Sequence, residues 1–194
     1  MMSSNNVGLS PGNVPVNHGG VHLKDLDRRV RTTELVLRFW VFFLGIVAVT
    51  LIVTDSQVRE FFTIQRKATF TNMKSLVFLV AANAIAAGYS VMQGTRCIVS
   101  MVRGNVLFNK RLAWAIFSGD QVMAYLTVAA VSVSMQSSMF GKLGESKWQW
   151  MQLCDLYGQY CKQAGEGLAS ALCASIGMVA LSGISAFSLF RLYE

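Results

Sequence analysis

Hydrophobic positions along the chain come in four long runs rather than in an alternating pattern. The runs cover residues 35–53, 76–101, 112–135 and 168–189, and charged side chains within them are few. About 20 consecutive apolar residues in a helix cross the roughly 30 Å hydrocarbon layer of a membrane. The pattern therefore predicts an all-α integral membrane protein whose fold is a bundle of four transmembrane helices.

The segment before the first run has the opposite character. Residues 1–33 are rich in Ser, Asn and Gly and contain both prolines of the chain, Pro11 and Pro15. Such a composition buries too little apolar surface to offset the entropy lost when a chain becomes ordered. We therefore expect a disordered cytoplasmic N-terminal tail over residues 1–33, followed by one membrane domain over residues 34–194.

Basic residues flank the four runs unequally and predict the orientation of the bundle. Lys and Arg near the ends of spans favour the cytoplasmic side of a membrane. Ten of the 17 basic residues fall on one side of the predicted bundle and seven on the other. The larger set is Lys24, Arg28, Arg29, Arg31, Arg38, Arg96, Arg103, Lys110, Arg111 and Arg191. This distribution predicts that both termini are cytoplasmic.

Composition supports a membrane protein and argues against two other classes. Hydrophobic residues make up 53% of the chain and charged residues 14%, and the mean hydropathy is +0.44. The net charge of +7 does not indicate nucleic-acid binding, because the basic residues are scattered rather than gathered in one stripe with aromatic residues. The two histidines, His18 and His22, lack metal-ligand spacing, and no nucleotide-binding or hydrolase motif occurs. We predict neither enzyme activity nor a metal or cofactor.

Two charged side chains lie inside the predicted spans, where charges are rare and usually functional. At a rise of about 1.5 Å per residue, Asp120 lies about 12 Å from the cytoplasmic edge and Arg38 only a few ångströms from it. Arg38 could reach inward and pair with Asp120 inside the bundle, which is the interpretation that we favour. In the alternative, Arg38 extends to the lipid headgroups, and Asp120 is protonated or bonded to a neighbouring helix.

Small residues recur at intervals of four in two of the runs. Ala84 and Gly88 lie in the second run, and Ala169, Cys173 and Gly177 lie in the fourth. Residues spaced in this way share one side of a helix and let two helix backbones approach closely. We expect these residues to pack within the four-helix bundle, and an interface between subunits is the alternative.

Two cysteines lie in the polar stretch between the third and fourth runs. The predicted orientation places Cys154 and Cys161 outside the cell, where conditions are oxidising, and Gly158 between them gives the backbone freedom to turn. We predict a disulfide that constrains this loop and presents Tyr157 and Tyr160 at its surface. Two free thiols are the alternative, because a continuous helix would hold the cysteines too far apart. Cys97, near the cytoplasmic edge, is a candidate acceptor for palmitate.

These features together resemble a known family. Arg38 in the first span, Asp120 in the third, the paired loop cysteines and the short basic second connection resemble the plant Casparian strip membrane domain protein-like family, which is related to the MARVEL tetraspan proteins. The resemblance covers roughly residues 31–193. Its most recognisable stretches are Glu60–Thr63, Asn83–Tyr89 and Cys154–Cys161.

The resemblance implies a function that hydropathy does not show. It implies a protein of the plasma membrane that forms homo-oligomers and hetero-oligomers with its relatives, contacts membrane lipid and has extracellular wall-modifying proteins as partners. A non-enzymatic scaffold that organises membrane domains linked to local cell-wall modification is the function that we favour. A small channel or transporter that uses Asp120 is the alternative, although no proline interrupts any span and few polar groups lie within them.

Overall fold

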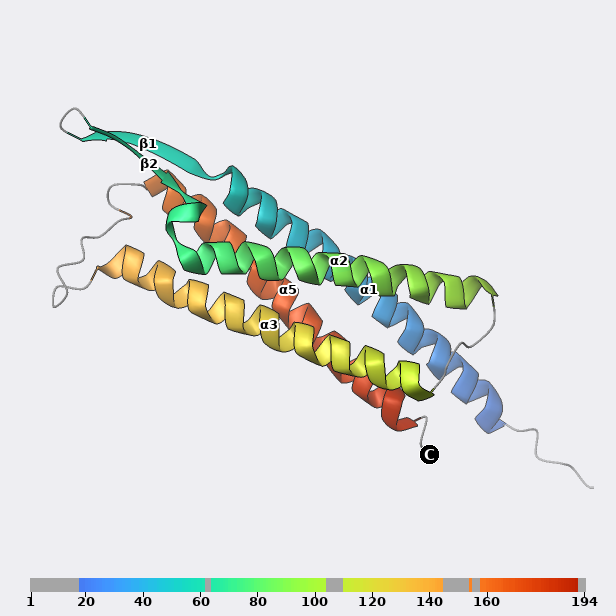
Figure 1. Cartoon of the computed structure of the whole chain (residues 1–194). Coiled ribbons are helices and arrows are strands. Elements are labelled where there is room, and N and C mark those ends of the chain that lie inside the picture. Colours follow the sequence, from blue (N-terminus) through green and yellow to red (C-terminus); the bar gives the residue numbers. More distant parts are fainter. Residues whose placement is uncertain (1–17, 62–63, 104–109, 145–153, 155–157, 192–194) are drawn as a thin grey trace, which may run out of the picture.

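The computed structural model describes residues 18–61, 64–103, 110–144, 154 and 158–191. Four long helices form a bundle: α1 (His18–Thr54), α2 (Lys74–Arg103), α3 (Lys110–Leu143) and α5 (Gly158–Arg191) (Figure 1). Each helix contains a segment long and apolar enough to cross a membrane. The prediction of a membrane domain with four transmembrane helices is thereby confirmed.

The helices are arranged so that each has two principal neighbours. α1 packs against α2 and α5, and α3 packs against the same two helices from the other side, so α1 and α3 are diagonal across the bundle. We call the end at which α1 begins and α5 ends the termini end, and the opposite end the hairpin end (Figure 1). A connection between α1 and α3 therefore has to cross the centre of the bundle.

All four helices extend beyond the hydrophobic runs that predict them, α2 by only two residues at each end. α3 continues to Leu143 instead of stopping near Met135, and α5 already begins at Gly158. Extending an existing helix adds a hydrogen bond for each residue fixed, whereas starting one is unfavourable, so polar residues without proline readily continue a span. α3 ends where Gly144 takes a positive φ of 66° and its N–H donates to the Phe140 carbonyl at 3.0 Å.

The expected disordered tail is wrong for residues 18–33, because α1 begins at His18 and runs without interruption into the first span. These residues contain no proline, and several good helix formers such as Leu23, Lys24 and Arg28 follow the glycine pair. The adjoining span supplies a helix nucleus, so composition alone underestimated helical order here. Residues 1–17 lie outside the described part of the chain.

A β-hairpin joins α1 to α2 at the hairpin end. Strands β1 (Ser56–Phe61) and β2 (Ile64–Thr69) pair antiparallel, with Ser56 opposite Thr69 and Phe61 opposite Ile64. A 3₁₀ turn, η1 (Phe70–Asn72), leads into α2. We did not expect this hairpin, since the connection lacks the Asn-Gly or Asp-Gly pair that usually marks a two-residue turn.

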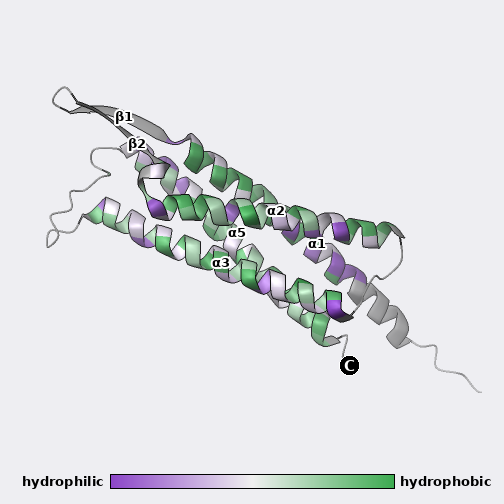
Figure 2. Cartoon of the chain, viewed as in Figure 1, coloured by the Kyte–Doolittle hydropathy of each residue, from purple (hydrophilic) through white to green (hydrophobic). Residues whose placement is uncertain are grey.

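The core of the bundle changes character along its length. Toward the hairpin end, an apolar cluster includes Ile52, Leu79, Ala130 and Ala171, all nearly inaccessible. Toward the termini end, a smaller apolar cluster around Met178 and Leu181 adjoins buried polar side chains. Figure 2 shows the four helices coloured mainly as hydrophobic, with isolated hydrophilic positions. The two charged side chains buried between the helices, Arg38 and Asp120, therefore lie in the half of the bundle near the termini end.

The small residues with a spacing of four do not act as one packing surface. Gly177 is buried, and a Cβ atom there would lie only 2.8 Å from Cγ2 of Val41, so its lack of a side chain lets α1 and α5 approach. The other four residues are exposed, so the expectation that they pack within the bundle is wrong for them. They are Ala84, Gly88, Ala169 and Cys173. A step of four residues rotates about 40° past a full helical turn, so a row of such residues drifts around the helix.

Candidate functional site

Arg38 of α1 and Asp120 of α3 meet in the centre of the bundle. Arg38 Nη1 donates to Asp120 Oδ1 at 3.2 Å, and Arg38 Nη2 donates to Asp120 Oδ2 at 3.0 Å. The two parallel hydrogen bonds form a bidentate ion pair. Only 1% of the Arg38 side chain and 0% of the Asp120 side chain are exposed. The pair thus links the two diagonal helices in the interior, as in the interpretation that we favoured from the sequence.

Two further side chains complete the hydrogen bonding of this pair. Glu34, one helical turn before Arg38, accepts from Arg38 Nε at 3.1 Å and from Arg38 Nη2 at 2.8 Å. Ser185 of α5 donates its hydroxyl to Asp120 Oδ2. An isolated charge in an apolar interior is costly unless it is paired and hydrogen-bonded. Glu34 and Ser185 therefore help both charged groups to remain buried.

Tyr89 of α2 also contacts this network. The Tyr89 ring lies beside the Arg38 guanidinium, with 5.9 Å from Cζ to the ring centroid, a distance at which a cation is attracted to the ring. The Tyr89 hydroxyl donates to the Ile116 carbonyl at 3.4 Å and accepts from Gln93 Nε2 at 3.2 Å. A Cβ atom at Gly119 would lie 2.6 Å from the Tyr89 hydroxyl, so only glycine leaves room for this ring beside Asp120.

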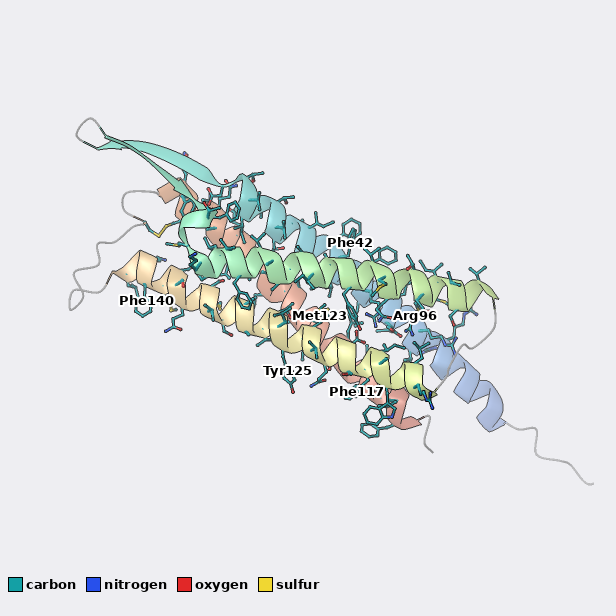
Figure 3. The ribbon with its side chains drawn as sticks, in the orientation of Figure 1. Phe42, Arg96, Phe117, Met123, Tyr125 and Phe140 are labelled. Atoms are coloured by element: carbon teal, nitrogen blue, oxygen red, sulfur yellow. A yellow bond between two sulfur atoms is a disulfide. The ribbon has the colours of Figure 1, made fainter. Side chains whose placement is uncertain are left out.

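The network is balanced in charge and receives side chains from all four helices. Arg96 of α2 lies near enough to Glu34 and Arg38 to interact with both electrostatically, and Figure 3 labels it between α2 and α1. Two arginines, Arg38 and Arg96, thus accompany two carboxylates, Glu34 and Asp120. Opposite charges in equal number are a stable arrangement in a medium that solvates a net charge poorly.

Sequence reasoning found only two members of this network. Arg38 and Asp120 stood out because they interrupt apolar runs. Glu34 and Ser185 were missed, since an acid before a span and a serine within one are ordinary at the sequence level. The spacing of four between Glu34 and Arg38, which places them on one side of a helix, is the signal that could have found the first.

The structure joins Cys154 and Cys161 in a disulfide with a Cα to Cα distance of 5.6 Å. Cys161 lies in the first turn of α5. The two cysteines do not share a continuous helix, because seven positions of one helix would hold their Cα atoms about 10.5 Å apart. Figure 3 shows the bridge at the hairpin end of the bundle. Tyr160 is only 4% exposed and belongs to the apolar core, so the expectation that it projects from the loop is wrong. Tyr157 lies outside the described residues.

Asp55, directly after α1, is a buried carboxylate outside the spans. It is 5% exposed, and its Oδ2 atom has no hydrogen-bond partner in the described part of the chain. Burial raises the pKa of the Asp55 carboxyl from 3.8 to about 6, because the charged form loses its hydration. Tyr160 of α5 lies close enough to interact with it electrostatically. The hairpin end therefore contains one group that titrates in a mildly acidic range.

Replacement of Asp55 is expected to stabilise the protein near neutral pH. A pKa raised on folding means that the charged form opposes folding above about pH 6, and that this penalty disappears as the pH falls toward about 4. Since a pKa unit corresponds to about 1.36 kcal/mol and water lies close to the membrane edge, we expect Asp55→Asn to add about 1 to 2 kcal/mol at about pH 7.5. Thermal unfolding in detergent at both pH values measures the gain.

The matched control for this measurement is Glu166→Gln, which neutralises an exposed acid of α5. It should change stability little at either pH. A stabilisation by Asp55→Asn that is equally large at about pH 4 and about pH 7.5 would contradict the assignment, because the effect would then not depend on ionisation.

Cys97 lies in a contact between helices rather than on an open surface. It is 9% exposed, and its thiol approaches the carbonyl of Arg31 on α1, with 4.0 Å between sulfur and oxygen. An acyl chain on this sulfur would require α1 and α2 to separate. The geometry thus disfavours palmitoylation at Cys97.

Comparison with known proteins places these features in a family. Residues 27–177, which include the ion pair and the disulfide, match the family model described as the Casparian strip membrane protein domain. CASP-like protein 2B1 of Vitis vinifera is 64% identical over 192 residues, which cover 99% of this chain and 95% of the relative. CASP-like protein 2B1 of Ricinus communis is 63% identical with the same coverage, and CASP-like protein 2B2 of Arabidopsis thaliana is 58% identical over 99% of this chain and 94% of the relative. No solved structure matches the chain. The chain therefore belongs to the family of membrane proteins defined by the Casparian strip membrane protein domain.

Proposed function

We propose that the protein is a non-enzymatic scaffold of the plasma membrane, with both termini in the cytoplasm. It associates with copies of itself and with family relatives, and it organises membrane domains at which extracellular proteins modify the cell wall. The observation that carries this proposal is that the intramembrane charges are engaged with one another. Membership of the family is consistent with it.

The ion pair supports a structural role for the intramembrane charges. Both Asp120 oxygens accept hydrogen bonds, from Arg38 and Ser185, and the carboxylate is fully buried. A carboxylate that binds and releases ions or protons during transport needs access to water, whereas this one is enclosed by side chains of all four helices. Its arrangement favours a rigid bundle over a transport pathway.

The outer surface of the bundle supports association in the membrane. Large apolar side chains point outward from every helix, and Figure 3 shows Tyr125 and Phe140 directed away from the bundle on α3. The outward-facing Ala84 and Gly88 leave a shallow place on α2 where another helix can approach closely. Lipid tails cover most of such a surface. A helix of a second copy can pack where the exposed side chains are small.

Localisation of a tagged protein in its native tissue tests the proposal. We expect fluorescence in patches of the plasma membrane beside modified wall, with little recovery after photobleaching, because a protein in a large assembly diffuses slowly. A single-span plasma-membrane protein with the same tag is the control and should recover fully. Uniform distribution with recovery equal to that of the control would argue against a scaffold.

Enlarging a small residue on the outer surface should weaken self-association. A Cβ atom at Gly88 meets nothing within 4 Å, so Gly88→Leu adds volume without a clash inside the monomer. We expect the dissociation constant of the oligomer in detergent to rise about tenfold. Light scattering of the purified protein measures it. Gly141→Leu on α3 is the matched control, since that position is also open. Equal dissociation constants of the two variants would show that the surface around Gly88 takes no part in self-association.

A further inference from the structure

A groove opens between α1 and α5 near the termini end. Its volume is about 340 Å³. Residues of both helices line it, among them Arg29, Val30 and Thr33 of α1 and Gly183, Ile184 and Phe187 of α5. On α1 these residues precede the first apolar run (35–53), whereas on α5 they lie within the last run (168–189). The groove therefore lies at the predicted cytoplasmic boundary of the membrane, and its α5 wall lies in the hydrocarbon layer.

The walls of the groove are apolar and its only charge is at the boundary. The Thr33 hydroxyl donates to the Arg29 carbonyl at 2.9 Å, so it needs no further acceptor. The exposed Arg29 side chain is the only charged one in the lining. Among the described side chains, which on α1 begin at Arg28, no carboxylate lies at ion-pair distance from it. The groove thus combines an exposed cation at headgroup level with an apolar channel directed into the bilayer.

The charge and the walls of the groove indicate what occupies it. Arg29 at one end is complementary to an anionic headgroup, and the apolar walls are complementary to a hydrocarbon chain. An acyl chain is narrow and flexible enough to enter it. The channel is open at Gly183, where a Cβ atom would meet nothing within 4 Å.

We propose that this groove binds an anionic phospholipid of the membrane. The lipid phosphate pairs with the Arg29 guanidinium, which can donate two parallel hydrogen bonds to phosphate oxygens. One acyl chain lies along Val30, Ile184 and Phe187. A lipid with no net charge can use the apolar channel but gains less from Arg29. The site is independent of the scaffold function, because it requires neither self-association nor a particular localisation.

Binding of phosphatidylserine to purified full-length protein tests this site. Native mass spectrometry from detergent, with phosphatidylserine or phosphatidylcholine added, gives the dissociation constant for each lipid. We expect wild-type protein to prefer phosphatidylserine. Arg29→Gln should weaken phosphatidylserine binding about fivefold, as expected for the loss of one basic residue at the headgroup level. Gly183→Leu, which fills the channel, should weaken binding of both lipids about tenfold.

The chain offers a matched control for each variant. Gly165 is also an exposed, open position of α5, and it lies on the same side as Gly183 about five helical turns away, so Gly165→Leu adds the same volume outside the groove. Arg28→Gln removes a neighbouring charge that does not line the groove. Both controls should bind phosphatidylserine like wild type.

Three results would overturn the proposal. Equal affinity of the wild-type protein for the two lipids would show that Arg29 does not select an anionic headgroup. Equal effects of Gly183→Leu and Gly165→Leu would show that the lipid does not bind in the groove. A shift in oligomeric state by Gly183→Leu, with unchanged lipid binding, would show that a second copy of the chain contacts this surface. Melting temperatures of all variants verify that each is folded.

Discussion

Replacing Asp120 with asparagine is expected to lower the free energy of unfolding by about 3 kcal/mol, because Arg38 would then keep a buried charge with only Glu34 to compensate it. Arg38→Gln should be more damaging, by about 4 to 5 kcal/mol, since it leaves two carboxylates without their cation. This order of effects follows from the position of Arg38 between Glu34 and Asp120. Chemical denaturation in mixed micelles, followed by tryptophan fluorescence, measures the losses.

The double variant separates the ion pair from general damage to the bundle. Arg38→Gln combined with Asp120→Asn places two neutral amides where two charges were, so its loss should be well below the sum of the single losses. Arg28→Gln is the control for removal of an arginine that is exposed. Strictly additive losses would mean that the two side chains do not stabilise each other in solution.

Loss of the disulfide is expected to lower the free energy of unfolding by about 2 to 3 kcal/mol. A bridge between cysteines separated by seven positions limits mainly the freedom of the unfolded chain. It also fixes the start of α5, where Tyr160 enters the apolar core beside Cys161. The double variant Cys154→Ser and Cys161→Ser, compared with wild type by thermal unfolding, gives the size of the effect.

Two controls accompany the disulfide measurement. Cys173→Ser changes a free, exposed cysteine of α5 and should leave the melting temperature nearly unchanged. A reductant should destabilise wild-type protein and have no effect on the double variant. Recovery of Cys154 and Cys161 as alkylated free thiols from correctly localised protein would refute the bridge.

The sequence was sufficient to predict the membrane spans but not which side of each helix faces the interior of the bundle. Leu76 and Leu79 are buried whereas Val77 and Phe78 beside them are exposed, although all four are equally apolar. In water, the exposed positions of a helix are polar, and periodicity identifies the inner side. In a bilayer, lipid tails are as apolar as leucine, so this contrast is lost. For this reason the expectation that Ala84 and Gly88 pack within the bundle was wrong.

Length and hydropathy by themselves determined that this chain crosses a membrane four times, because an apolar segment of about 20 residues has no alternative in a bilayer to a closed helix. Sequence also singled out Arg38 and Asp120, since a charge in such a segment is conspicuous. Only the tertiary structure decided that the two meet across the diagonal of the bundle and that Glu34, Tyr89 and Ser185 surround them. Those contacts depend on how each helix is rotated about its axis, and that rotation is set by close packing between helices, such as Gly177 against Val41, rather than by any local pattern.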